Sequence, residues 1–200
     1  TLQLFSEAAS LQRKVLFVSS GGTVYGEAIR LPIQEDHPTK PISPYGVTKL
    51  TLENYAHLFG KTRGLQYICV RPANAFGPGQ KPFAGQGFIA TAVASAFKGI
   101  PIKVFGGEGM IRDYLYVDDL VSGMISILDK GRLYHTYNIG SGVGRSNMDV
   151  IKSISCLVNE SEHAVVVEHF PERPFDVKAN ILDSSVLCEH TGWNARVDFD

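Results

Sequence analysis

The stretch KVLFVSSGGTVYG, residues 14–26, decides the fold class of this chain. Its first part, Lys14 to Ser19, is a short apolar run that ends in small residues, which is typical of a buried parallel strand. Its second part, Ser20 to Gly26, is rich in glycine and small polar residues, and it predicts a turn. Buried parallel strands occur in α/β proteins, so the rest of the chain should alternate between strands and helices.

Strands and helices do alternate along the chain. After a proline-containing loop at residues 28–44, the apolar spacing predicts a helix from Tyr45 to Phe59, with Ser43 as its N-cap and Gly60 as its end. Further strands are expected at residues 66–71, 102–105, 136–139 and 164–168, and helices at residues 87–97, 117–128 and 147–158. This order indicates an α/β fold.

Two side-chain patterns mark the starts of helices. Ser146 is followed three residues later by Asp149, which resembles a capping box with Asp in place of Glu. Asp118 and Asp119 look like a catalytic carboxylate pair, but adjacent residues on a helix point in different directions. We therefore expect these two carboxylates to cap the helix that begins there.

Composition excludes several classes of protein. With 200 residues and 44% hydrophobic content, the chain is long and apolar enough to bury a core, so it is neither disordered nor fibrous. Its net charge of -1 gives no general attraction to nucleic acid or to a membrane surface. No apolar run approaches the roughly 20 residues of a membrane span. Three widely separated cysteines fit a reducing cytoplasm.

Metal chemistry has no support in the sequence. The six histidines are scattered, and none has the spacing of a metal-ligating pair. We expect His37, His163 and His169 to lie at the surface, and we expect no metal site.

Tyr45 and Lys49 form the first candidate constellation. They are four residues apart on the predicted helix, so their side chains share one face. An ammonium group beside a phenol favours the tyrosinate, which can act as a general base. Eight tyrosines and ten lysines in 200 residues also allow such a pair by chance, so the pair needs further context.

Five motifs in a fixed order supply that context. They are SSGGTVYG at 19–26, PYGVTK at 44–49, RPANAFGPGQ at 71–80, RDYLYVDDL at 112–120 and YNIGSG at 137–142. Together they resemble the extended short-chain dehydrogenase/reductase family, and most closely its nucleotide-sugar epimerases of the UDP-glucose 4-epimerase type. The resemblance covers nearly the whole chain.

The resemblance implies a bound NAD and a set of residues around its nicotinamide end. Tyr45 is implied to be the catalytic acid/base, and Lys49 its electrostatic partner and a ligand of the nicotinamide ribose. The remaining implied cofactor contacts are Ser19, Ser20, Pro72 and Ala73.

The hydroxyl that usually polarises the sugar in this family is missing. Four residues before the tyrosine of the VYG run the family carries Ser or Thr, whereas this chain has Gly21. Thr23 is the first candidate to replace that hydroxyl, and Ser20 is the second. Gly21 also suits a tight turn.

A nucleotide-sugar substrate is implied by the later motifs. Asn74 is implied to contact the diphosphate, although an asparagine at a strand end also forms turns. Free N–H groups at the start of the helix at 87–97 can bind phosphate. The implied substrate contacts are Asn74, Gly87, Phe88, Phe105 along the base, Arg112 and Arg173 on the phosphates, and Asp176 on the ribose.

A second glycine cluster imitates a dinucleotide-binding motif. Gly140, Gly142 and Gly144 follow a predicted strand, but position 145 is Arg145, where the motif requires glycine. We expect these glycines to shape the return of the chain into the substrate-binding domain.

The motif order also predicts the domain organisation. SSGGTVYG belongs to the middle of a dinucleotide-binding domain, whose glycine-rich opening is absent from this sequence. The expected fold is α/β, with the C-terminal part of a Rossmann-like doubly wound parallel sheet (residues 1–75 and 112–141) and a smaller α/β substrate-binding domain (residues 76–111 and 142–200). We expect the isolated chain to bind NAD poorly.

The resemblance implies epimerisation of a UDP-sugar through a transient 4-keto intermediate. Dehydratases of the family carry an acid before the VYG tyrosine, where this chain has Gly21, Gly22 and Thr23. The alternatives are a related reductase or dehydrogenase, and an inactive nucleotide-binding relative. A homodimer is implied, for which Leu52, Tyr55 and Phe59 are available unless they belong to the core.

Overall fold

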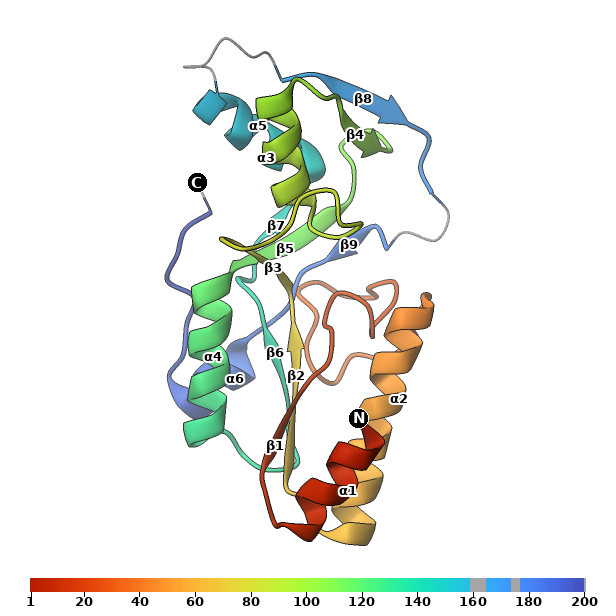
Figure 1. Ribbon diagram of the computed structural model, residues 1–200, viewed down its shortest axis with the longest axis vertical. Coiled ribbons are helices and arrows are strands. Elements are labelled where there is room, and N and C mark those ends of the chain that lie inside the picture. Colours follow the sequence, from red (N-terminus) through yellow and green to blue (C-terminus); the bar gives the residue numbers. More distant parts are fainter. Residues whose placement is uncertain (159–164, 174–176, 200) are drawn as a thin grey trace.

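A parallel sheet of three strands forms the centre of one half of the molecule (Figure 1). Its strands are β1 (Val15–Val18), β2 (Tyr67–Pro72) and β6 (Thr136–Ile139), in the order β1-β2-β6. The structure is a computed structural model and describes residues 1–158, 165–173 and 177–199. The three apolar runs predicted as strands form this sheet, and β2 is buried almost throughout, as a strand covered on both faces must be.

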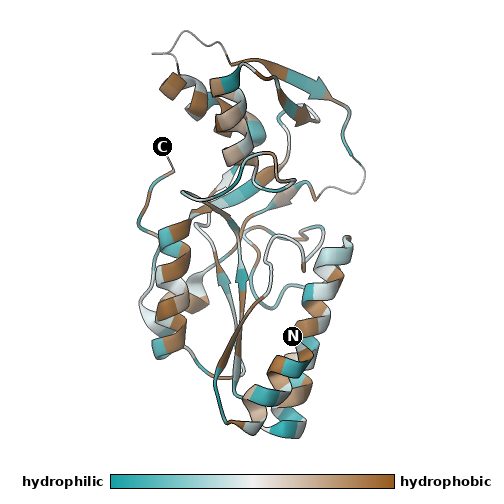
Figure 2. Cartoon of the chain, viewed as in Figure 1, coloured by the Kyte–Doolittle hydropathy of each residue, from teal (hydrophilic) through white to brown (hydrophobic). Residues whose placement is uncertain are grey.

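Helices cover both faces of this sheet, so the doubly wound α/β architecture is confirmed (Figure 1). On one face lie α1 (Leu2–Ser10) and α2 (Pro44–Arg63), where Phe5 packs edge-on against Phe17 and Phe59. On the other face lie α4 (Val117–Lys130) and α6 (Ser185–Thr191). Figure 2 shows hydrophobic residues along β1 and mixed hydrophobic and hydrophilic residues along α2 and α4, as expected for helices packed on one side only.

The other half of the molecule is built on smaller sheets. One contains β3 (Asn74–Phe76), β5 (Ile111–Tyr116), β7 (Gly144–Arg145) and β9 (Ala179–Asn180), and the other pairs β4 (Ile102–Phe105) with β8 (Val167–Phe170). The helices α3 (Phe88–Lys98) and α5 (Asn147–Val158) pack together over an apolar cluster with β4. The cavity described below lies where this half meets the central sheet.

The ends of the helices follow local chemistry. The Ser43 hydroxyl accepts a hydrogen bond from Gly46 N at 3.1 Å, so the predicted N-cap is confirmed. At α5, Ser146 and Asp149 bond each other's backbone N–H groups, which confirms the capping box. The predicted end of α2 at Gly60 is wrong, because the helix continues to Gly64, which adopts the left-handed conformation with φ +68°.

Several expectations need correction. Asp118 and Asp119 do not cap α4, whose N-cap is Tyr116; Asp119 instead accepts backbone hydrogen bonds from Arg196 and Val197, both at 2.9 Å. The strand expected at 164–168 is β8 at 167–170, and residue 164 lies outside the described residues. The elements α1, β3, β5, β7, β9 and α6 were not predicted.

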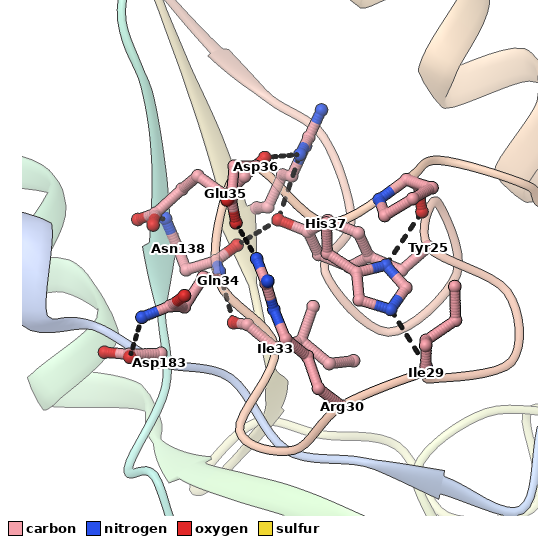
Figure 3. Close-up of polar contacts among 12 residues, drawn as sticks. Tyr25, Ile29, Arg30, Ile33, Gln34, Glu35, Asp36, His37, Asn138 and Asp183 are labelled. Carbon is pink, nitrogen blue, oxygen red and sulfur yellow. Dashed lines mark hydrogen bonds and ion pairs between the residues drawn. The ribbon is translucent and has the colours of Figure 1, made fainter.

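His37 is buried rather than at the surface. It is 3% exposed, its ring packs edge-on against Tyr25, and its Nε2 accepts a hydrogen bond from Ile29 N at 2.9 Å. Figure 3 shows this ring folded inside the loop that carries residues 29 to 37. His169 is exposed as predicted, and His163 lies outside the described residues.

Searches for two other kinds of feature were negative within residues 1–158, 165–173 and 177–199. No helix there combines the length and hydropathy that crossing a bilayer requires. No three His, Cys, Asp or Glu side chains are grouped so as to hold a metal ion.

Candidate active site

A cavity of about 590 Å³ lies at the carboxyl ends of β1 and β2. This is the edge of an open α/β sheet where ligands usually bind. Most of the residues singled out from the sequence line it: Ser19, Ser20, Thr23, Tyr45, Lys49, Pro72, Ala73, Asn74, Gly87, Phe88 and Arg112. Asn74 is exposed to this cavity, so it is not a buried turn former.

Lys49 is held at the end of β1 by the backbone. Its Nζ donates a hydrogen bond to Val18 O at 2.8 Å and lies 5.5 Å from the centroid of the Tyr45 ring. Tyr45 itself is 50% exposed and lines the cavity. The strand end therefore fixes the cation next to the phenol, as the helical spacing predicted.

The turn after β1 packs directly against the start of α2. A Cβ atom at Gly46 would come within 2.7 Å of Thr23 O, so only glycine lets the turn approach the helix beside Tyr45. The hydroxyl oxygens of Ser19 and Thr23 are both buried and lack a hydrogen-bond partner among the described residues. Buried hydroxyls without partners cost free energy, which indicates that a polar ligand group completes this corner of the cavity.

Gly21 has no room for a side chain. A Cβ atom there would lie 2.5 Å from Leu182 Cδ1 and 2.9 Å from Arg71 O, while Gly21 N donates to Pro72 O at 2.9 Å. The backbone of β2 therefore occupies the space that a serine or threonine would need. The missing hydroxyl cannot be restored at this position without moving the turn.

We predict that Gly21→Ser lowers the free energy of unfolding by about 1–3 kcal/mol, the usual cost of overpacking, and does not raise turnover. Urea denaturation checks the stability. The matched control is Gly22→Ser, where the nearest atom to a new Cβ is Asn74 Oδ1 at 3.3 Å. Unchanged stability together with a large gain in turnover would show that the turn does accept the missing hydroxyl.

Phe105 and Arg173 lie together but line a neighbouring cavity of about 320 Å³. The Arg173 guanidinium carbon is 3.5 Å from the centroid of the Phe105 ring, which is close enough for a cation–π contact. Adjacent residues of β5 connect the two cavities, since Ile111 lines this one and Arg112 lines the larger one. Asp176 lies outside the described residues.

Asp113 is a buried carboxylate that the sequence reasoning left without a role. It accepts hydrogen bonds from Ser141 N and Oγ, Gly142 N and Leu182 N, at 2.6 to 3.2 Å. Burial nevertheless raises the pKa of this carboxyl above its usual range. The glycine turn after β6 therefore wraps around a carboxylate in this structure.

A buried polar network ties α2 to the sheet. Arg71 of β2 forms a two-pronged ion pair with Glu53 of α2, with Nε–Oε1 at 3.0 Å and Nη2–Oε2 at 2.6 Å. The same guanidinium donates to Tyr25 Oη at 2.9 Å, and Tyr25 donates to Asn138 Oδ1 at 2.7 Å. Figure 3 shows Tyr25, His37 and Asn138 converging from the loop and β6. The network fixes the helix that carries Tyr45.

Comparison with known proteins gives consistent matches. The model of the NAD dependent epimerase/dehydratase family matches residues 1–140. The UDP-glucose 4-epimerase of Mycolicibacterium smegmatis is 32% identical over 194 residues, which are 96% of this chain and 61% of that protein. The dTDP-4-dehydro-6-deoxyglucose reductase of Escherichia coli is 32% identical over 189 residues, or 94% of this chain and 58% of that protein.

A solved structure agrees with these sequence matches. The crystal structure of UDP-glucose 4-epimerase from Thermotoga maritima with UDP-glucose superposes with a TM-score of 0.90 at 32% identity, covering 98% of this chain and 63% of that one. The chain thus spans about three fifths of the length of these relatives.

Proposed function

This chain belongs to the NAD dependent epimerase/dehydratase family, and on that premise we propose that it carries the active site of a UDP-sugar 4-epimerase. The observation that supports this most directly is the pairing of Tyr45 with Lys49 in the lining of the cavity, where Lys49 is fixed on Val18 O. Such a pair can take a proton from a sugar hydroxyl and give it back.

The residues at the end of β1 fit the nicotinamide end of NAD. The ammonium of Lys49 can donate to ribose hydroxyls. The buried hydroxyl of Ser19, which has no hydrogen-bond partner among the described residues, belongs to the same cavity lining as Pro72 and Ala73. When bound, NAD supplies an acceptor for a hydride from the sugar carbon and returns that hydride later.

The proposed mechanism uses three side chains. Tyr45 Oη accepts the proton of the sugar 4-hydroxyl, while Lys49 stabilises the charge that Tyr45 carries. Thr23 Oγ1 hydrogen-bonds the same sugar oxygen and keeps it in line with Tyr45. After the 4-keto sugar has turned, Tyr45 returns the proton to its oxygen. The cycle has no net redox change.

We propose that the rest of the cavity holds the nucleotide diphosphate. Arg112 and Asn74 would supply donors for phosphate oxygens, and Gly87 and Phe88, at the start of α3 where helices can bind phosphate, line the same cavity. Phe105 and Arg173 would then contact the base and phosphate from the neighbouring cavity, and Asp176 the ribose.

The lining of the cavity favours epimerisation over dehydration. Among the described residues that line it there is no aspartate or glutamate, so no carboxylic acid is available to move a proton at carbon. The Escherichia coli relative, named as a reductase, favours reduction of a 4-keto nucleotide sugar as the second candidate.

We further propose that residues 1–75 and 112–141 belong to the NAD-binding domain, and residues 76–111 and 142–200 to the substrate-binding domain. In the described part, β1 pairs only with β2, so its other edge is open. Of the three residues considered for a homodimer interface, Tyr55 is 37% exposed and available, whereas Phe59 is buried in the core and Leu52 packs against that core.

The three cysteines are unpaired, which supports a cytoplasmic location.

An assay of the whole protein with NAD and UDP-glucose tests the proposed function. We expect UDP-galactose to form without a lasting change in absorbance at the nicotinamide band. Stoichiometric consumption of a reduced nicotinamide with a 4-keto sugar would instead identify the reductase. Absence of turnover with UDP-glucose, UDP-N-acetylglucosamine and UDP-glucuronate would overturn the proposal.

A further inference from the structure

Asn180 of β9 is hydrogen-bonded to the turn that leads to Thr23, the residue whose hydroxyl is proposed to contact the sugar. The residue is 1% exposed, and its Nδ2 donates a hydrogen bond to Gly21 O at 3.0 Å. This bond reaches the turn from the C-terminal part of the chain, beyond every motif on which the family resemblance rests. Asn180 is not among the residues that line the cavity.

Neighbouring contacts also restrict the movement of the turn at Gly21. Leu182 packs against Gly21, and Leu182 N donates to Asp113 Oδ2 at 3.2 Å. The backbone on the other side of the turn is fixed as well, because Gly21 N donates to Pro72 O. Gly21 is thus fixed at its carbonyl oxygen by Asn180 and at its N–H by Pro72 of β2.

The same strand also supports the expected phosphate contact. Asn180 is the register partner of Arg112 in the parallel pairing of β9 with β5. One short strand therefore contacts both the turn that leads to Thr23 and the strand that carries Arg112. A shift of β9 would therefore displace both the turn at Gly21 and the strand that carries Arg112.

We propose that Asn180 is a positioning residue that fixes the turn from Gly21 to Thr23, so that the Thr23 hydroxyl meets the sugar oxygen. The inference rests on the proposed epimerase function. An amide is suited to this place because it can donate to Gly21 O without bringing a charge into a buried site.

A double-mutant cycle in the whole protein tests the inference. The variants are Asn180→Ala, Thr23→Val and the double variant, each measured for kcat and KM with UDP-glucose. We expect Asn180→Ala to lower kcat about tenfold to a hundredfold, the scale of a misplacement of about 1 Å, with KM changed less than about threefold. In the Thr23→Val background the same change should lower kcat less than about twofold, because the hydroxyl it positions is gone.

A control separates positioning from loss of stability. Thr191→Val also removes buried side-chain hydrogen bonds to backbone, the one donated to Leu187 O and the one accepted from Trp193 N, but at the end of α6. It should lower the unfolding midpoint and leave kcat unchanged. If Asn180→Ala does not fold, Asn180→Ser enters the same cycle.

Two results would overturn the inference. One is an effect of the Asn180 variant on kcat that is equally large with and without the Thr23 hydroxyl. The other is an unchanged kcat in the single variant. Lack of turnover in the unmodified protein would instead contradict the proposed function, and the inference with it.

Discussion

Replacing Tyr45 by Phe lowers kcat about a thousandfold, within the range of 10²–10⁴ that a positioned acid/base contributes. The expected loss is large because the phenol oxygen is the proposed proton acceptor, and Phe keeps the ring but removes that oxygen. Lys49 would remain on Val18 O, since its hydrogen bond does not involve Tyr45. KM should change little, because the ring that lines the cavity is retained.

The measurement is initial-rate kinetics of UDP-glucose epimerisation by the whole protein. Tyr134→Phe is the matched control, because Tyr134 is 54% exposed, close to the 50% of Tyr45, and does not line the cavity. Its kcat should equal that of the unmodified protein. Normal turnover by Tyr45→Phe would exclude the proposed mechanism.

Replacing Glu53 by Ala destabilises the protein by about 3–5 kcal/mol, the usual cost of breaking a buried ion pair. Both side chains of the Glu53–Arg71 pair are only 8% exposed. The substitution leaves the guanidinium of Arg71 buried, with Tyr25 and the backbone of Glu35 as its remaining contacts. Equilibrium denaturation by urea gives the free energy of unfolding for this comparison.

The double variant Glu53→Met with Arg71→Met distinguishes an unpaired charge from lost packing. Since both charges are removed together, it should cost clearly less than Glu53→Ala, because apolar replacements of similar volume are often neutral. A Glu53→Ala variant within about 1 kcal/mol of the unmodified protein would mean that solvent reaches Arg71 and compensates it.

Local patterns predicted the central sheet and the proximity of Lys49 to Tyr45, whereas the other residues of the candidate site were implied by the family resemblance. The apolar runs became β1, β2 and β6, and helical spacing placed Lys49 beside Tyr45. Apolar periodicity carries this information because burial of one face or both is a local property of a segment. The short strands β7 and β9 have two residues each, too few for any period, and pairing with β5 alone makes them strands.

The contacts of buried polar side chains were not predicted from the sequence either. Nothing in the sequence near Arg71 indicates that Glu53 and Tyr25 neutralise and bond it, and Asp113 obtains its donors from residues 28 to 69 positions away. His37 was predicted to lie at the surface for the same reason. The sequence shows that its side chain is polar but not that a loop encloses it. Partners of this kind are known only from the tertiary structure.

The Asn180–Gly21 hydrogen bond joins residues 159 positions apart, so it also bears on when the site forms during folding. Closing so long a loop costs more chain entropy than forming a helix or pairing strands that are close in the sequence. On a chain that emerges from the ribosome in order, Tyr45, Lys49 and the turn are synthesised well before the strand that holds the turn in place. Tyr45 and Lys49 can therefore come together early, whereas the complete pocket has to wait for almost the last residues of this sequence.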